Sequence, residues 1–158
     1  MIASILAAVI ITVGSVLAPK ANSTITTVCP HIICTAVSSV QNPSSNYQVE
    51  HLNFSCSQTL SNMTIIQVVQ RNFNETHAQR YQTFWNYSTN MTYIENPTQI
   101  IYKWYSLPDM HIVAPSFPHF IETQFYYTTG SVRITSNDTW QIWIESICGD
   151  PLYLFGTF

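Results

Sequence analysis

The sequence predicts an all-β protein, an antiparallel sandwich of seven to nine strands. Short stretches in which apolar and polar residues alternate recur along the chain, and turn residues separate them. None of these stretches keeps the period of an amphipathic helix. The chain has four glycines in 158 residues, which is few for the tight hairpins of a closed barrel. Two packed sheets are therefore favoured.

The strand with the clearest pattern is 47–56, in which Leu52, Phe54 and Cys56 share one face. The β-branched run 64–69 is typical of a central strand. Further strands are expected at 81–93, 98–105, 122–128, 131–135, 139–148 and 152–158, with a polar connection at 72–79 that forms a short helix around 75–79 and a proline-containing break at 107–118.

Residues 1–21 are predicted to be a signal peptide. The apolar run 2–18 precedes small residues, as at a cleavage site. The run lacks a preceding Lys or Arg, and Pro19 follows Ala18, so cleavage after Ala21 or near Ser15 and an uncleaved membrane anchor all stay open. A run of 17 residues is at the short limit for a membrane span. We therefore expect a secreted protein with no membrane span after cleavage, of unknown oligomeric state.

Seven N-x-Ser/Thr acceptors predict N-glycosylation in the endoplasmic reticulum. A glycosylated asparagine must stay in water, so each acceptor predicts an outward-facing position. Five of the seven fall between residues 53 and 92, which predicts one sugar-covered side of the molecule. The acceptors are Asn22, Asn53, Asn62, Asn74, Asn86, Asn90 and Asn137.

Charge is scarce in this chain. Charged residues make up 8% of it, against about 25% in an average soluble protein. The formal net charge is −3 and there is no basic stripe, which excludes a nucleic-acid partner. Glycans would keep such a surface soluble without ionic side chains.

Four cysteines in a secreted chain predict two disulfides. Three pairings are possible, and we favour Cys29–Cys34 with Cys56–Cys148, because Cys56 and Cys148 lie on the apolar faces of strands that a bridge would tie together. A zinc site is disfavoured, since the C-x4-C pair has no second pair. Residues 22–46 are predicted to be an extended N-terminal segment, followed by one domain at 47–158.

Catalytic motifs are missing from the sequence. There is no G-x-S-x-G, no H-E-x-x-H and no glycine-rich phosphate loop. His111 and His119 flank the proline-containing break, with Asp109 and Glu122 nearby, but nearness in sequence alone does not make a metal or general-base site. We predict a protein that is not an enzyme and that takes no cofactor or metal.

Aromatic residues gather in 93–136, a stretch without an acceptor. Tyr126 and Tyr127 are adjacent, as are Trp104 and Tyr105, so one of each pair faces outward in a strand. Exposed aromatic side chains are the usual material of binding hot spots. The predicted partner-binding residues are Trp104, Tyr105, Phe117, Phe120, Tyr126 and Tyr127.

Three segments resemble parts of an immunoglobulin domain of the variable type. Leu52–Cys56 (LNFSC) resembles the strand with the first cysteine, 130–144 (GSVRITSNDTWQIWI) the stretch before the second, and Cys148 with 155–157 (FGT) the final hairpin. The expected core tryptophan after the first cysteine is replaced by Ile66 and Val68, and Ser146 stands where a tyrosine is expected.

In composition the chain is similar to small immunoglobulin-like glycoproteins of cytomegalovirus and of the adenovirus early regions. That resemblance implies binding of a host or cell-surface protein ligand or receptor, with an immunomodulatory role. Two other functions stay open. One is a lipocalin-like β-barrel that carries a small hydrophobic ligand, with the aromatic residues lining a cup. The other is a structural coat glycoprotein.

Overall fold

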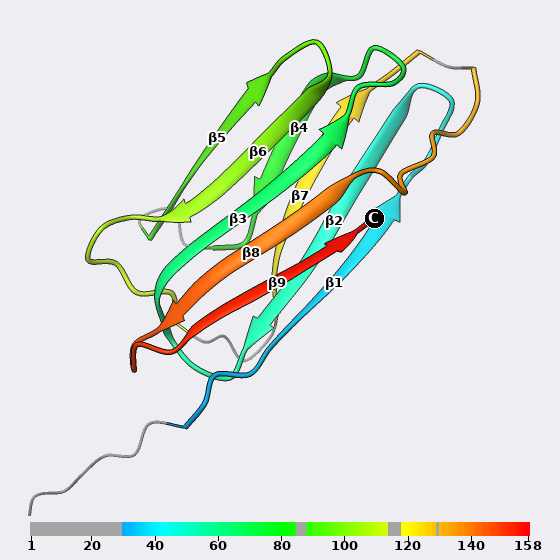
Figure 1. Ribbon diagram of the computed structural model, residues 1–158. Coiled ribbons are helices and arrows are strands. Elements are labelled where there is room, and N and C mark those ends of the chain that lie inside the picture. Colours follow the sequence, from blue (N-terminus) through cyan, green and yellow to red (C-terminus); the bar gives the residue numbers. More distant parts are fainter. Residues whose placement is uncertain (1–29, 85–87, 114–117, 129) are drawn as a thin grey trace, which may run out of the picture.

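The computed structural model describes residues 30–84, 88–113, 118–128 and 130–158. These residues form two packed antiparallel sheets (Figure 1). The strands are β1 (Cys34–Gln41), β2 (Tyr47–Cys56), β3 (Leu60–Gln70), β4 (Thr76–Gln82), β5 (Thr89–Glu95), β6 (Gln99–Ser106), β7 (His119–Tyr126), β8 (Thr139–Ser146) and β9 (Pro151–Thr157).

The strand order is that of an immunoglobulin-like sandwich with one change. One sheet has the order β1-β2-β7-β4, and the other has β5-β6-β3-β8-β9. The first order corresponds to strands A-B-E-D of an immunoglobulin domain, and β3-β8-β9 corresponds to C-F-G. The added strand β6 pairs with β3, and β5 pairs with β6. Both follow β4 in the chain, whereas the added strands of a variable domain precede strand D. The predicted sandwich is confirmed, and the barrel alternative is wrong because both sheets are open.

The core lies between the inner faces of the two sheets. Alternation sets it, because every second side chain of a strand points inward. Trp104 and Tyr102 on β6 are fully buried and face Phe125 and Leu52 from the other sheet. Leu152 and Leu154 of β9 close one side of the core. Beside them, Ser38 Oγ of β1 donates a hydrogen bond of 2.7 Å to the carbonyl of Thr157, so the edges of the two sheets meet there.

The strands with strict alternation lie where the sequence predicts them. The prediction for 47–56 matches β2, and those for 98–105, 139–148 and 152–158 match β6, β8 and β9 to within two residues. The run 64–69 lies inside β3, which is central in its sheet as predicted.

Three predicted elements are wrong. The segment 75–79 is not helical, because β4 pairs with β7 from Thr76 onward. The predicted strand 81–93 belongs to two strands of different sheets, β4 and β5. The segment 131–135 forms no strand, because Arg133 turns inward and is 4% exposed.

The disulfide is the largest correction. Cys34 bonds to Cys56, so neither favoured pairing exists. The two cysteines are register partners of the antiparallel strands β1 and β2, with Cα atoms 4.1 Å apart. Cys148 is also disulfide-bonded, and Cys29 lies outside the described residues. The predicted N-terminal segment thus contains a strand, and the sandwich begins at Cys34 rather than at residue 47.

Gly156 on β9 lies under the ring of Trp140, and a Cβ atom there would overlap the indole. We expect Gly156→Ala to destabilise the protein by about 1–3 kcal/mol, as overpacked cores do. Urea unfolding measures this change. The neighbouring exposed residue provides the control, Thr157→Ala, which should leave the unfolding midpoint nearly unchanged. Equal midpoints for both variants would contradict the close packing of Trp140.

Candidate interaction surface

The predicted partner-binding residues do not form one surface. Trp104 and Tyr127 are core residues with exposed fractions of 0% and 3%, so they offer nothing to a partner. Phe120 and Tyr126 lie on the outer face of the four-stranded sheet, whereas Tyr105 lies on the outer face of the five-stranded sheet. Phe117 lies outside the described residues. As expected, alternation turns one residue of each adjacent pair outward. The two outward residues, Tyr105 and Tyr126, lie on opposite faces of the molecule.

Another exposed aromatic cluster lies on β8 and β9. Trp143, Tyr153 and Phe155 are 55%, 38% and 72% exposed, and we call them the β8–β9 aromatic surface. Trp143 and Tyr153 are register partners, with ring centroids 4.2 Å apart. The ring of Phe155 stacks on that of Tyr153, with centroids 5.6 Å apart. The sequence contained the signal for this cluster, because alternation in 139–148 places Trp143 opposite the apolar face.

The strands beside this cluster contribute further apolar side chains to the same outer face. Ile66 and Val68 of β3 and Ile101 of β6 point outward in neighbouring rows of the same sheet and are partly buried. Among the outward positions of the five strands, the charged residues are Lys103 and Glu145. The ammonium group of Lys103 lies over the ring of Tyr105, 5.3 Å from its centroid. Apolar patches of this kind on a protein surface mark interaction sites.

The outer face of the four-stranded sheet is more polar. His51 packs on Phe120 with ring centroids 4.5 Å apart, and burial lowers the pKa of His51 while Glu122 opposes that shift. Glu122 and Gln124 lie in the same rows, and Tyr47 donates a hydrogen bond of 2.5 Å to Gln124. The aromatic residues here are interrupted by charge and amide groups.

The described glycan acceptors lie on both sheets, so the prediction of one sugar-covered side is wrong. Asn53 lies within the outer face of the four-stranded sheet, 3.4 Å from the His51 ring nitrogen. Asn62 and Asn90 are exposed on the five-stranded sheet, at the start of β3 and on its edge strand β5. Asn74 and Asn137 are exposed in connections. Asn22 and Asn86 lie outside the described residues.

The histidines that flank the proline-containing break do not converge on a site. His119 points into the core end, where its ring lies 4.4 Å from that of Phe84 and burial lowers its pKa. Glu122 points to the opposite side of β7, and His111 and Asp109 are exposed. Within the described residues, no group of three or more His, Cys, Asp or Glu side chains is arranged to hold a metal ion.

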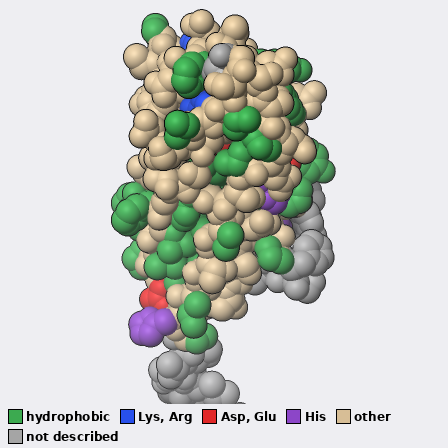
Figure 2. Space-filling view, turned by 90° about the vertical axis from the view of Figure 1, so that its right-hand side faces the viewer, with side chains coloured by type: hydrophobic (Ala, Val, Ile, Leu, Met, Phe, Trp, Pro, Cys, Tyr) green, Lys and Arg blue, Asp and Glu red, His purple; other side chains and the backbone are tan. Residues whose placement is uncertain are grey.

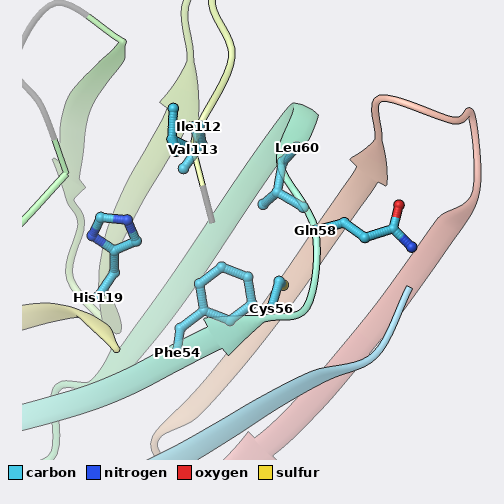
Figure 3. Close-up of a pocket in the computed structure, with 7 residues that line it drawn as sticks. All are labelled: Phe54, Cys56, Gln58, Leu60, Ile112, Val113 and His119. Atoms are coloured by element: carbon cyan, nitrogen blue, oxygen red, sulfur yellow. The ribbon is translucent and has the colours of Figure 1, made fainter. Parts of the chain in front are cut away.

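A small cavity at the end of the core has no room for a carried ligand (Figure 3). Its free volume is about 10 Å³, which matches one water molecule at most. A carrier would need an enclosed cavity of roughly 300 Å³ or more. The hollow of about 450 Å³ beside Ser61, Asn62 and Glu145 is open to solvent and lined mostly by polar side chains. The residues that line the small cavity are Phe54, Cys56, Gln58, Leu60, Ile112, Val113 and His119.

Charged side chains are sparse on the side of the molecule where β1 and β9 meet (Figure 2). His31 lies 3.5 Å from Asp150. The described part of the chain contains no helix long and apolar enough to cross a membrane.

Comparisons with known proteins add little. No protein-family model matches the chain, and no curated protein matches it either. Among solved structures, the chain is similar to ACE19, the collagen-binding subdomain of the Enterococcus faecalis surface protein ACE. The TM-score is 0.41 with 10% sequence identity, over 78% of this chain and 92% of that one. This identity is too low to carry a ligand or an activity from one protein to the other.

The exposure of Trp143 is testable by fluorescence. We expect Trp143→Phe to remove a component that acrylamide quenches strongly, because its ring is open to solvent. Trp104→Phe serves as the comparison and should remove an unquenched component, since that ring is 0% exposed. A Trp143→Phe variant with the same quenchable fraction as the wild type would contradict the exposed position.

Proposed function

We propose that this chain is a secreted, N-glycosylated binding protein without catalytic activity. It engages a protein ligand or receptor at a cell surface or in extracellular fluid through the β8–β9 aromatic surface. The observation that carries this proposal is the exposed and mutually packed set of Trp143, Tyr153 and Phe155.

The three aromatic residues have the properties of an interface centre. Tryptophan and tyrosine are enriched among the residues that contribute most to binding. Trp143 and Tyr153 already pack on each other and stand on rigid strands, so little side-chain freedom is lost when a partner covers them. Ile66 and Val68 extend the apolar area.

The positions of the acceptors support the same face. Neither β8 nor β9 contains an acceptor. On the same sheet, Asn62 of β3 is the register partner of Glu145 at the end of β8, and Asn90 lies on the edge strand β5. A glycan on Asn53 would stand in the outer face of the four-stranded sheet and hinder binding there. Both outer faces carry acceptors, so the proposed unsugared area is the outward side of β8 and β9 with the aromatic cluster, and not the whole of 93–136.

The expected partner surface is apolar and nearly neutral. The two charged residues on the outward positions of this sheet are Lys103 and Glu145, so long-range charge steering is weak. Binding should therefore depend little on salt concentration. An immunomodulatory partner is the finer form of the proposal and rests on the compositional resemblance to viral glycoproteins.

Removal of the aromatic surface should abolish binding. We expect the double variant Trp143→Ser, Phe155→Thr to lose at least about 100-fold in affinity, because hot-spot residues each contribute about 2 kcal/mol or more. The measurement is binding of the secreted protein to a panel of extracellular domains of cell-surface proteins.

Tyr126→Ser is the matched control for this experiment. Tyr126 is 56% exposed, as Trp143 is 55% exposed, but it lies on the opposite sheet. The control should keep wild-type binding. A partner that binds the folded double variant as tightly as the wild type would rule out this surface.

Glycosylation has its own test. Protein expressed in mammalian cells should appear in the medium and lose mass when the N-glycans are removed enzymatically. Asn53→Gln should remove one glycan and make the four-stranded sheet accessible to modification at Tyr126, which is exposed in the fold. An unchanged mass after enzyme treatment would show that the chain carries no N-glycan.

A further inference from the structure

Four charged side chains form a cluster inside the sandwich, which we call the buried charge cluster. Its members are Glu50, Glu75, Arg133 and Asp138, and the exposed fraction of each side chain is 0%. Glu50 belongs to β2, Glu75 precedes β4, and the other two belong to the connection before β8. The cluster thus joins that connection to the four-stranded sheet.

Arg133 commits its donors to two of the three carboxylates. Its Nε donates a hydrogen bond of 2.6 Å to Glu75, and both terminal nitrogens donate to Asp138. Nη2 also donates to the carbonyl of Gln70 at 2.6 Å. The distance from Nη1 to Glu50 is 3.6 Å, which is too long for a hydrogen bond. Glu50 is therefore the one carboxyl group of the three that accepts no hydrogen bond from the guanidinium.

Backbone amides also donate to Asp138 and Glu75 rather than to Glu50. The amide of Gln70 donates to Asp138 at 2.7 Å, and the amide of Phe73 donates to Glu75 at 2.8 Å. The donors to Glu50 are two side-chain amides, Gln67 at 2.6 Å and Gln48 at 3.2 Å. Glu50 and Asp138 both lie beside Nη1 of Arg133, and burial together with the Asp138 carboxylate raises the pKa of Glu50. Two carboxyl groups can share a hydrogen bond when one of them carries a proton.

The cluster is one positive charge short of balance even with a proton bound. One guanidinium faces three carboxylates, so full ionisation would leave two uncompensated negative charges in the core. Such burial is strongly unfavourable, and a carboxyl group in that situation takes up a proton. The surroundings are also short of donors, because the side-chain oxygens of Gln48 and Gln67 have no hydrogen-bond partner among the described residues.

We propose that the folded protein holds a proton on Glu50, shared with Asp138, that the unfolded chain releases at neutral pH. The buried charge cluster is then a proton-dependent lock between β2 and the connection before β8, and it makes the sandwich more stable in mildly acidic surroundings. This inference is independent of the proposed binding function.

Electrostatics agree with the geometry. Burial raises the pKa of Glu50 well above its ordinary value, Asp138 raises it further, and Arg133 and Gln67 oppose the rise. Tyr102 of β6 also faces Glu50, and burial raises the pKa of its hydroxyl, so it stays neutral. Burial lowers the pKa of Arg133, but the carboxylates around it raise that pKa by more. Arg133 therefore stays charged.

The sign of the pH dependence follows from the raised pKa of Glu50. Its contribution to stability is complete below the ordinary pKa of 4.5 and is lost as the pH rises through the higher pKa in the fold. Over that range the ratio of folded to unfolded protein falls by up to about tenfold per pH unit. His51, His77 and His119 act in the opposite direction, because burial lowers the pKa of each. Only a difference between variants isolates Glu50.

The test compares the full-length wild type with Glu50→Gln by urea unfolding from about pH 5 to about pH 8. The amide that this variant introduces is neutral at every pH, and it donates a hydrogen bond as the protonated carboxyl group does. We expect the two proteins to be about equally stable at pH 5. At pH 8 the ratio of folded to unfolded protein should be at least about tenfold higher for Glu50→Gln than for the wild type. Glu145→Gln, at an exposed carboxylate, should leave the pH dependence of the wild type unchanged.

Parallel pH profiles for the wild type and Glu50→Gln would overturn the proposal, as would a lower stability of the variant at pH 8. Infrared spectroscopy tests the same point if the variant does not fold. Folded wild type at neutral pH should show the band of a protonated carboxyl group, Glu145→Gln should keep it, and unfolding should abolish it. Folded wild type without that band would also overturn the proposal.

Discussion

Alternation on two open sheets is the constraint on which the rest of this structure depends. Each strand must fill one shared core and also cover an outer face, and the chain has few charged residues with which to cover it. The outer faces are therefore made from hydroxyl, amide, aliphatic and aromatic side chains. On the β8–β9 aromatic surface this composition exposes a tryptophan, a tyrosine and a phenylalanine side by side.

The buried charge cluster solves a different problem, which is how the long connection between β7 and β8 is held. The segment 131–135 pairs with no strand, but Arg133 reaches Glu75 across 58 positions of sequence and fixes the connection against the entry to β4. The two wrong predictions, at 75–79 and 131–135, have the same kind of cause. Contacts between distant residues, rather than local propensity, set the backbone there.

How much could be predicted from the sequence differs by feature. Strict alternation in 47–56 and 139–148 was sufficient to place β2 and β8, and it also marked Trp143 as outward-facing. The Cys34–Cys56 bridge could not be predicted, because 34–41 places Val37 outward and Ser38 inward, so that its residues give a weak strand signal. Trp104 and Tyr127 were misjudged as binding residues because alternation assigns faces but not which face is buried.

Strand β3 contacts both the buried charge cluster and the β8–β9 aromatic surface, but the two proposals can be tested separately. Its inner face presents Gln67 to Glu50, and its outer face supports the aromatic surface through Ile66 and Val68. An exposed apolar face on an open sheet also carries a risk of self-association. The acceptors Asn62 and Asn90 lie on the same sheet, Asn62 opposite Glu145 of β8 and Asn90 on the edge strand β5, where the proposed glycans would limit sheet-to-sheet stacking. In the proposed glycoprotein, sugar rather than ionic side chains would keep this apolar face in solution, because the chain has so little charge.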